Sequence, residues 1–291
     1  MVEHWLPYSR TEVPMRIPDE NLLGVVDAKY TPPAPNPQEE IAKALDNPLG
    51  TQRVEDLVKP GEKVCIVVDD QTRPTPSHHM VRPLLERLNR AGVKDSDIIV
   101  IVGCGTHLNT RPEEVAALIG EDCSKRVGLV IHDSEAPDLV QIGNTSFGTK
   151  VRVNKIFAEA EIKILTGDVE LHYFSGYGGG RKSVLPAITD TEATRHNHAF
   201  LLDPKAKTGN LEGNPVHLDM TEAAYLSKVN FTINLVLNPK GQVVKAYAGD
   251  LDQAFLEGVK LVDKMYKVSV ESAADIVVVS PGGHPMDVNL Y

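Results

Sequence analysis

The chain has 291 residues, of which 42% are hydrophobic and 24% charged, a balance typical of a globular protein with a large core. Its formal net charge of −10 argues against nucleic-acid binding and favours a small-molecule ligand, for which a local basic pocket could still hold an anion. The three widely spaced cysteines predict no disulfide framework, and the sequence has neither a signal peptide nor an apolar stretch of roughly 18 residues, so we expect a cytoplasmic protein without membrane contact.

A proline-rich segment at 30–40 is predicted to be a surface connector. Apolar and β-branched runs predict buried strands at 64–70, 97–103, 127–133, 161–167, 231–237 and 275–281. Apolar residues at helical spacing predict helices at 79–91, capped by Ser77, and at 112–119, 217–228 and 251–266. This alternation indicates an α/β fold, a mainly parallel sheet with flanking helices that is similar to a Rossmann fold.

Polar segments directly follow three of these strands, where open α/β sheets gather their ligands. Asp70 and Arg73 follow the first strand, and Arg73 could either clamp a carboxylate or simply form an ion pair with a neighbouring Asp. His107 follows the second strand and His172 the fourth. Either histidine alone would more often be structural, but two at matching strand ends favour a pair of general bases.

The stretch "HYFSGYGGGRKS" resembles a phosphate-binding loop, but Arg181 stands where the nucleoside-triphosphate pattern requires a glycine before Lys182. Its backbone from Ser175 through Gly179 and Gly180 could form an anion nest, and the two basic side chains add positive charge. We therefore expect a phosphate-like group here. The alternative is a glycine-rich turn with solvated basic residues.

Two further histidines, His196 and His198, lie two residues apart. That spacing puts them on different faces of a helix, so at most one is expected to face a shared metal or ligand. The other histidines form no spacing typical of a metal site.

Together these segments resemble the nickel-pincer-nucleotide lactate racemases and related 2-hydroxyacid racemases and epimerases. The resemblance rests on "DDQTRPTP", on "GTH" ending at His107, on "HYFSGYGGGRKSVLPAI" and on "NH" at 197–198, and it continues through "GGHPMDVNLY". It implies an isomerase that uses a nickel-pincer nucleotide, nickel pyridinium-3,5-bisthiocarboxylic acid mononucleotide. The proteins that build this cofactor would then be partners of the chain.

The resemblance also implies roles for single residues. Lys182 corresponds to the lysine that can join the cofactor through a thioamide, and His198 to the protein ligand of nickel. His107 and His172 would each take the 2-hydroxyl proton of one enantiomer, while hydride passes reversibly between C2 and the cofactor. Arg73 would anchor the substrate carboxylate. The other implied cofactor contacts are Asp70, Ser175, Gly179, Gly180 and Arg181.

The sequence departs from the lactate enzymes at Gln71, where a histidine is expected, so the preferred substrate could be another 2-hydroxy acid. Family members continue well beyond the position of Tyr291. The resemblance therefore predicts a cofactor-binding domain over residues 1–268 and the beginning of a truncated second α/β domain over 269–291, and a chain of this length could be an inactive fragment.

Two other functions fit parts of this pattern. The loop could seat a mononucleotide or another phosphorylated ligand in a non-catalytic binding module, but such a module has no need of both His107 and His172. A phosphotransferase is disfavoured by Arg181 and by the lack of a recognisable magnesium motif.

Overall fold

A computed structural model describes residues 1–107 and 110–283 of the chain. These residues form two compact units, one of residues 30–265 and one that joins residues 1–29 to the segment from residue 266 onward. Each unit is described by itself below. The domain boundary expected at residue 268 stays a prediction.

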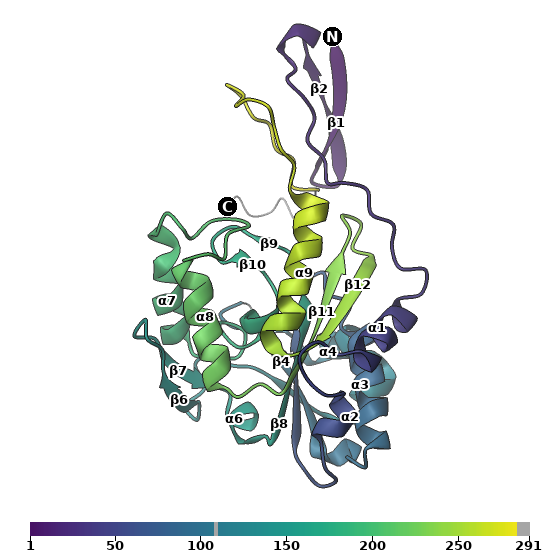
Figure 1. Cartoon of the computed structure of the whole chain (residues 1–291), viewed down its shortest axis with the longest axis vertical. Helices are drawn as coiled ribbons and strands as arrows, with labels where there is room; N and C mark the ends of the chain where they lie inside the picture. Colours follow the sequence, from purple (N-terminus) through teal and green to yellow (C-terminus); the bar gives the residue numbers. More distant parts are fainter. Residues whose placement is uncertain (108–109, 284–291) are drawn as a thin grey trace. The chain divides into compact units, whose positions relative to one another are not determined.

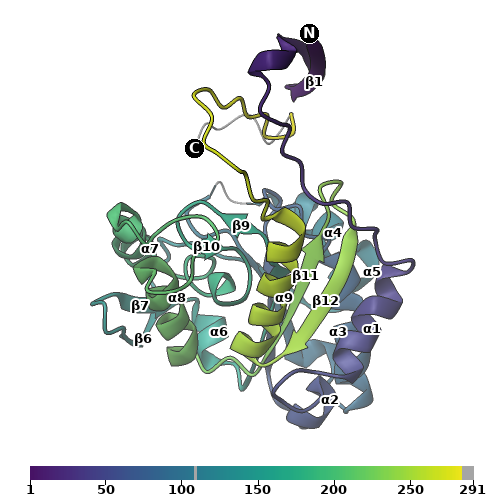
Figure 2. The same cartoon turned by 45° about the horizontal axis from the view of Figure 1, so that its top comes forward.

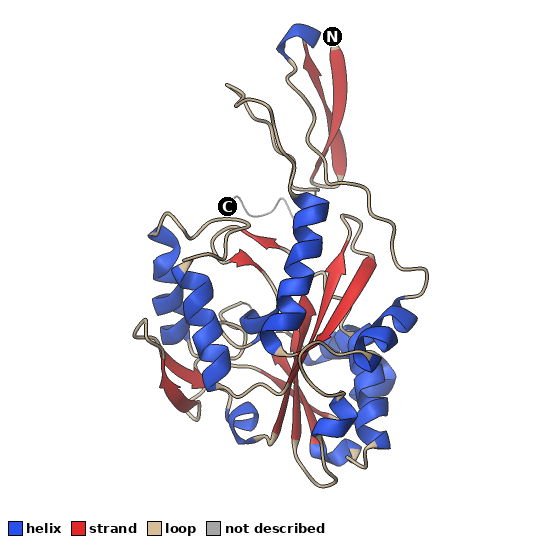
Figure 3. Ribbon diagram, in the orientation of Figure 1, coloured by secondary structure: helices blue, strands red, loops and turns tan. Residues whose placement is uncertain are grey.

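Helices and strands alternate along most of the described chain (Figures 1 and 3). The strands are β1 (Val2–Tyr8), β2 (Thr11–Ile17), β3 (Val64–Asp69), β4 (Ile98–Gly103), β5 (Gly128–Ile131), β6 (Val140–Asn144), β7 (Lys150–Val153), β8 (Ile162–Asp168), β9 (Leu171–His172), β10 (Gly176–Tyr177), β11 (Phe231–Leu237) and β12 (Val243–Gly249). The helices are α1 (Pro37–Asp46), α2 (Val54–Leu57), α3 (His78–Arg90), α4 (Pro112–Ile119), α5 (Glu121–Ser124), α6 (Lys155–Glu159), α7 (Thr191–Ala199), α8 (Pro215–Leu226) and α9 (Leu251–Tyr266).

The large unit is built on a six-stranded sheet with the order β12-β11-β8-β3-β4-β5. The pairs between β11, β8, β3, β4 and β5 are parallel, and β12 joins the edge antiparallel to β11. The register sets Asp69 beside Gly103 and Leu235 beside Asp168, so the carboxyl ends of β8, β3 and β4 lie next to one another. The predicted fold class, a mainly parallel sheet with flanking helices, is confirmed.

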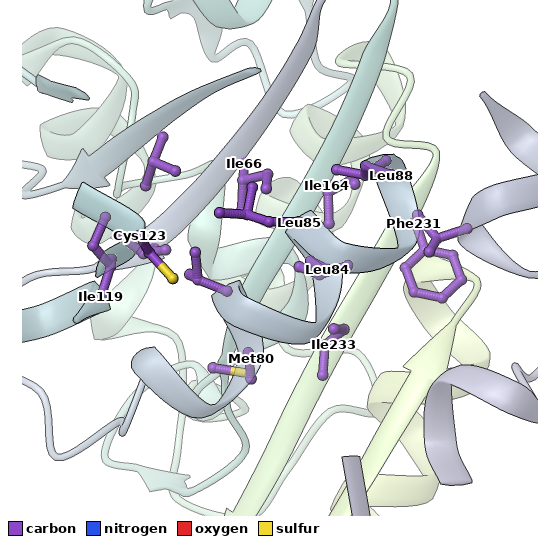
Figure 4. Packing of buried hydrophobic residues seen from close by; sticks show 14 of the residues in the cluster. Ile66, Met80, Leu84, Leu85, Leu88, Ile119, Cys123, Ile164, Phe231 and Ile233 are labelled. Atoms are coloured by element: carbon purple, nitrogen blue, oxygen red, sulfur yellow. The ribbon is translucent and has the colours of Figure 1, made fainter. Parts of the chain in front are cut away.

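Helices cover both faces of this sheet because successive side chains of a buried strand point to opposite faces. In β3, Ile66 belongs to the cluster with α1, α3 and α4, whereas Val67 belongs to the cluster with α6, α7 and α8. Figure 4 shows Leu84, Leu85 and Leu88 of α3 packed over Ile66 and its neighbours. Figure 2 shows α1 and α3 on one side of the sheet and α6, α7 and α8 on the other.

The structure differs from the sequence-based prediction at three places. Residues 275–281, predicted to be a strand, pair with no other strand among the described residues, and Ile276 and Val277 are exposed. The connector ends earlier than expected, because α1 begins at Pro37 with Asn36 as its N-cap. Ser77 does precede α3, but its side chain makes no capping hydrogen bond.

The small unit contains the hairpin β1-β2, which no pattern in the sequence suggested. Its strands pair antiparallel from Val2 opposite Ile17 to Tyr8 opposite Thr11. The Ser280 hydroxyl donates to the carbonyl oxygen of Pro7 at 2.6 Å. Apolar side chains lie on both faces of β1, with Trp5 exposed and Leu6 half-buried, so the sequence lacks the apolar–polar alternation that identifies a strand.

Candidate active site

The candidate residues gather at the carboxyl edge of three adjacent strands. Asp70 and Arg73 follow β3, His107 follows β4, and His172 lies in β9 after the end of β8. Because all three strands run parallel, the segments that follow them leave the sheet at the same edge.

His107 lies between a carboxylate and a guanidinium group. Its Nδ1 lies 2.7 Å from Oδ2 of buried Asp70, and its Nε2 lies 3.2 Å from Nη2 of Arg73. Arg73 can only donate, so Nε2 accepts and Nδ1 carries the ring proton that Asp70 receives. His107 is therefore neutral with an acceptor nitrogen directed toward Arg73.

Asp70 stays ionised in this arrangement. Burial acts to raise its pKa, but hydrogen bonds from His107 and from the hydroxyl and N–H of Thr72 outweigh burial and lower it. A buried carboxylate on Nδ1 fixes the tautomer of His107 and stabilises its protonated form, as an acid–histidine pair requires for base catalysis.

In His172 the proton is on the other ring nitrogen. Its Nδ1 accepts the backbone N–H of Ser175 at 3.3 Å, so in the neutral ring the proton sits on Nε2. Burial lowers the pKa of His172 to about 2, and the positive charges of Lys182 and Arg73 act in the same direction. The ring also stacks on Tyr173, with centroids 4.9 Å apart. His172 is thus a neutral hydrogen-bond donor.

Lys182 projects from the short 3-10 helix Gly180–Ser183. Burial, helped by the charges of Arg181 and Arg73 and opposed by that of Glu170, lowers its pKa to about 7. Its Nζ lies 5.9 Å from the centroid of the Phe174 ring. A large fraction of the amine is therefore unprotonated near neutral pH, which makes it a nucleophile.

Arg181 faces inward and holds the glycine loop together. Its Nη1 donates to the carbonyl oxygens of Gly178 and Gly179, and its Nη2 donates to those of Ser175 and Tyr177 at 3.0 and 2.9 Å. The guanidinium lies over the Phe255 ring, 4.3 Å from the centroid, and only 2% of the residue is exposed. In this structure Arg181 shapes the loop through its backbone carbonyls.

The loop amides are used within the protein. The N–H groups of Gly178, Gly180 and Lys182 donate to the Glu170 carbonyl, the Asn234 side chain and the Gly179 carbonyl. The Ser175 hydroxyl likewise donates to the Tyr177 carbonyl. In this structure these three amides have protein acceptors, and a phosphate-like group at the loop stays a prediction.

The glycines of this loop are there for close packing. Gly179 has a φ of +78°, and a Cβ at this residue would lie 2.6 Å from the carbonyl oxygen of Asp168. Gly180, with a φ of +54°, would bring a Cβ to 3.1 Å from the Phe255 ring. The loop can run this close to β8 and α9 only without side chains at these positions.

His198 and His196 point away from each other on α7, as their spacing predicts. His196 is exposed and its Nε2 contacts the carbonyl oxygen of Phe147 at 3.0 Å. His198 is half-buried against Phe174, with centroids 4.9 Å apart, and its buried Nδ1 has no hydrogen-bond partner among the described residues. Burial lowers the pKa of His198 to about 4, and the charge of Lys182 adds to the effect. A neutral imidazole is suited to bind a metal through a ring nitrogen.

The three histidines share one neighbourhood. The charges of Lys182 and Arg73 act on His172, and the charge of Lys182 also acts on His198. The described residues hold no group of three or more His, Cys, Asp or Glu side chains that could bind a metal by themselves.

Other features lie outside this neighbourhood. Surface pockets of about 220 Å³ beside Lys163 and about 450 Å³ beside Arg152 include none of the candidate residues. Cys65, Cys104 and Cys123 are buried and free. In the part of the chain that the structure describes, no helix is both long and apolar enough to cross a membrane.

Sequence reasoning missed an acidic cluster beside Lys182. The Thr75 hydroxyl contacts carboxyl oxygens of both Asp69 and Asp168, and Glu170 follows two residues after Asp168. Burial raises the pKa of Asp69 to about 6 and raises those of Asp168 and Glu170 as well. The available signal was a pair of acids, "GDVE", directly after a buried strand.

Comparison with known proteins identifies relatives over most of the chain. The profile of the lactate racemase N-terminal domain family matches residues 8–209. The lactate racemase of Thermoanaerobacterium thermosaccharolyticum is 35% identical over 98% of this chain and 68% of its own length. The lactate racemase of Lactiplantibacillus plantarum is 36% identical over 100% of this chain and 69% of its own length.

Solved structures agree with this relationship. The lactate racemase apoprotein from T. thermosaccharolyticum superposes with a TM-score of 0.89 at 33% identity, over 99% of this chain and 68% of that one. A Thermotoga maritima protein shares the fold, with a TM-score of 0.67 at 24% identity over 78% of this chain and 59% of that one. Given the span of the family match and the identity to two named relatives, the chain belongs to the lactate racemase N-terminal domain family.

Proposed function

We propose that this chain carries the cofactor and base residues of a racemase or epimerase for a small 2-hydroxy acid, lactate or a close analogue, dependent on a nickel-pincer nucleotide. The observation that carries the proposal is the meeting of His107, His172 and His198 with Arg73 and Lys182 at one edge of the sheet. When bound, the cofactor would supply a reversible hydride acceptor for C2 of the substrate.

The residues fit such a cofactor on chemical grounds. His198 would hold nickel through a neutral ring nitrogen, consistent with its unpartnered buried Nδ1 and its low pKa of about 4. Lys182 would join the cofactor covalently, because an amine with a pKa of about 7 is nucleophilic at neutral pH. Among the described residues His198 would be the protein ligand, and the other donors would be the cofactor's.

Arg73 would bind the substrate carboxylate through its guanidinium. In the free protein this group donates to Nε2 of His107. Drawing Arg73 onto a carboxylate would release that nitrogen to accept the 2-hydroxyl proton of the substrate. Asp70 would then stabilise the resulting imidazolium, because its carboxylate already receives Nδ1–H at 2.7 Å.

His172 would act on the opposite enantiomer. As a base it would accept the 2-hydroxyl proton of that enantiomer, and the protonated ring would return a proton to the substrate oxygen while neutral His107 takes one, so that each histidine alternates between its neutral and protonated forms. One ring that accepts and one that donates are the pair needed to convert one hand into the other through a planar 2-oxo acid. The 3.3 Å bond from Ser175 is long enough to be given up when the roles reverse.

The other parts of the proposal concern context. Asp70 and the loop residues Ser175, Gly179, Gly180 and Arg181 would line the cofactor site, with Arg181 acting through the backbone that it holds. The cofactor-building proteins would be partners, and the chain would work in the cytoplasm. Gln71 leaves the identity of the 2-hydroxy acid open to lactate analogues.

The test is to express the chain together with the cofactor-building proteins. We expect about one nickel per chain, a mass increase on the peptide that contains Lys182, and interconversion of D- and L-lactate or an analogue. His198→Ala should lose nickel, whereas His107→Ala and His172→Ala should keep nickel and lose turnover by roughly 10²-fold or more. His196→Ala is the matched control, since its ring is on the exposed side of α7.

Each arm can contradict the proposal. Protein without nickel and without added mass in that host would refute the cofactor assignment. Turnover retained in either base variant would refute the two-base assignment. Nickel bound without turnover on any 2-hydroxy acid would favour the non-catalytic binding module.

A further inference from the structure

The hydroxyl of Thr75 joins two acids that end neighbouring strands. Thr75 is 6% exposed, and its Oγ1 lies 2.7 Å from Oδ2 of Asp69, the last residue of β3. The same oxygen also contacts Oδ1 of Asp168, the last residue of β8 and only 5% exposed. One buried hydroxyl thus has a carboxyl group of each strand as a hydrogen-bond partner.

The protons available to the Thr75 hydroxyl and the two carboxyl groups decide which of these contacts are hydrogen bonds. A threonine hydroxyl has one proton to donate, so it can donate to one carboxylate oxygen and not to both. The other contact is attractive only if the second carboxyl carries a proton and donates it to Oγ1. Two ionised carboxylates on one hydroxyl would leave a buried pair of lone pairs facing each other.

The burial of the two acids indicates which of them is protonated. Asp69 is partly exposed, whereas Asp168 is enclosed. Burial and the charge of Glu170 raise the pKa of Asp168 well above its ordinary value, and burial raises that of Asp69 to about 6. The neutral member of the pair is therefore the buried one.

We propose that Asp168 is a protonated acid in the folded protein and that it works as a positioning residue, through the directed chain Asp168 O–H to Thr75 O–H to the Asp69 carboxylate. Thr75 lies two residues after Arg73, so these two hydrogen bonds hold the turn that carries Arg73 to the ends of β3 and β8. The protonation is independent of the proposed function, whereas the effect on turnover rests on it.

A neutral Asp168 also limits the negative charge in this cluster. The charged groups that face the two acids are Arg73 on the same turn, Asp70 beside Asp69, and Glu170 after β8. Lys182 faces Asp69 and Glu170, and a further anion there would favour its protonated form. Holding a proton on Asp168 therefore helps to keep the Lys182 amine reactive.

The first experiment reads the proton directly on the cofactor-free chain. With aspartate labelled by ¹³C at the carboxyl carbon, NMR from pH 5 to pH 8 should show one resonance that stays at the protonated position. That resonance should vanish in Asp168→Asn and remain in Asp69→Asn, whose amide oxygen can still accept from Thr75. Its absence from the wild-type spectrum, or its loss in Asp69→Asn only, would overturn the proposal.

A second readout is stability. An asparagine at 168 can donate N–H to Thr75 as the neutral acid does, so Asp168→Asn should fold with an unchanged melting temperature. Failure of Asp168→Asn to fold would count against a protonated Asp168, and the wild-type spectrum and Thr75→Ser would still report on the proton. Thr75→Ser should keep the resonance, because it keeps the hydroxyl.

The positioning role is tested on the cofactor-loaded enzyme. Thr75→Val should raise KM for the 2-hydroxy acid roughly tenfold with a smaller change in kcat, because it loosens Arg73, and Thr75→Ser should restore KM. Equal losses in kcat and kcat/KM would refute this role. If the wild-type enzyme had no activity while the protonated resonance was present, the proposed function would fail and the protonation would stand.

Discussion

Replacing Lys182 with methionine should stabilise the protein, and the gain should depend on pH. Methionine keeps most of the apolar volume and contact with Phe174 while it removes the amine. The folded protein holds this amine with a pKa of about 7, against an ordinary value of 10.5. Folding therefore costs free energy whenever the amine is protonated in the unfolded chain.

The size and pH dependence of the stability gain follow from the difference between the folded and unfolded pKa of Lys182. At about 1.4 kcal/mol for each pKa unit, a pKa of about 7 corresponds to roughly 5 kcal/mol. Lys182 is partly exposed and faces Glu170 and Asp69, so we discount the gain to about 2 kcal/mol. Between pH 7 and 10.5 the unfolded chain binds the extra proton, so wild-type stability rises with pH and the advantage of the variant shrinks.

The assay is thermal unfolding of cofactor-free wild type and Lys182→Met at pH 6, 8 and 10. We expect the variant to melt about 4 °C higher at pH 6 and nearly level with wild type at pH 10. Lys207→Met, at an exposed lysine, is the control and should shift the melting temperature at no pH. A lower melting temperature for Lys182→Met at pH 6, or a gain equal at all three pH values, would refute the reasoning.

Two further predictions concern the base pair and the loop. Asp70→Asn should leave the melting temperature nearly unchanged and lower kcat of the loaded enzyme by roughly 10²- to 10⁴-fold. The reason is that a neutral amide cannot stabilise protonated His107. An unchanged kcat would contradict the acid–histidine pair. Gly176→Ala should cost more than about 2 kcal/mol in urea unfolding, because φ is +79° and the new Cβ would lie 2.3 Å from the carbonyl oxygen of Asn210. Gly24→Ala, with no atom within 4 Å of the added Cβ, is the matched control, and an equal effect of the two would contradict the packing argument.

Much of the fold and part of the site could be predicted from local pattern alone. Strands of a parallel sheet are continuous apolar runs, so β3, β4, β5, β8 and β11 were visible in the sequence, although β5, at the sheet edge, is exposed or half-buried and not buried as predicted. Parallel strands also deliver the residues that follow them to one edge, so His107 and His172 could be placed together before any contact was known.

Contacts between distant residues were beyond such patterns. In the sequence Arg181 is a candidate to bind an anionic ligand, yet its guanidinium donates hydrogen bonds to four backbone carbonyls of the loop. The proton shared through Thr75 depends on the register that sets the end of β8 beside β3. The 275–281 run has strand composition but no strand beside it among the described residues, and a strand exists only through hydrogen bonds to a neighbour.

The sequence by itself thus indicated the parallel strands of the sheet and the order in which polar residues leave it, because periodicity and strand direction are local properties. Tertiary structure alone decided where the side chains of Arg181, Thr75 and Asp168 point and which protons they hold. Those properties depend on partners far away in the chain and on how completely water is excluded between them.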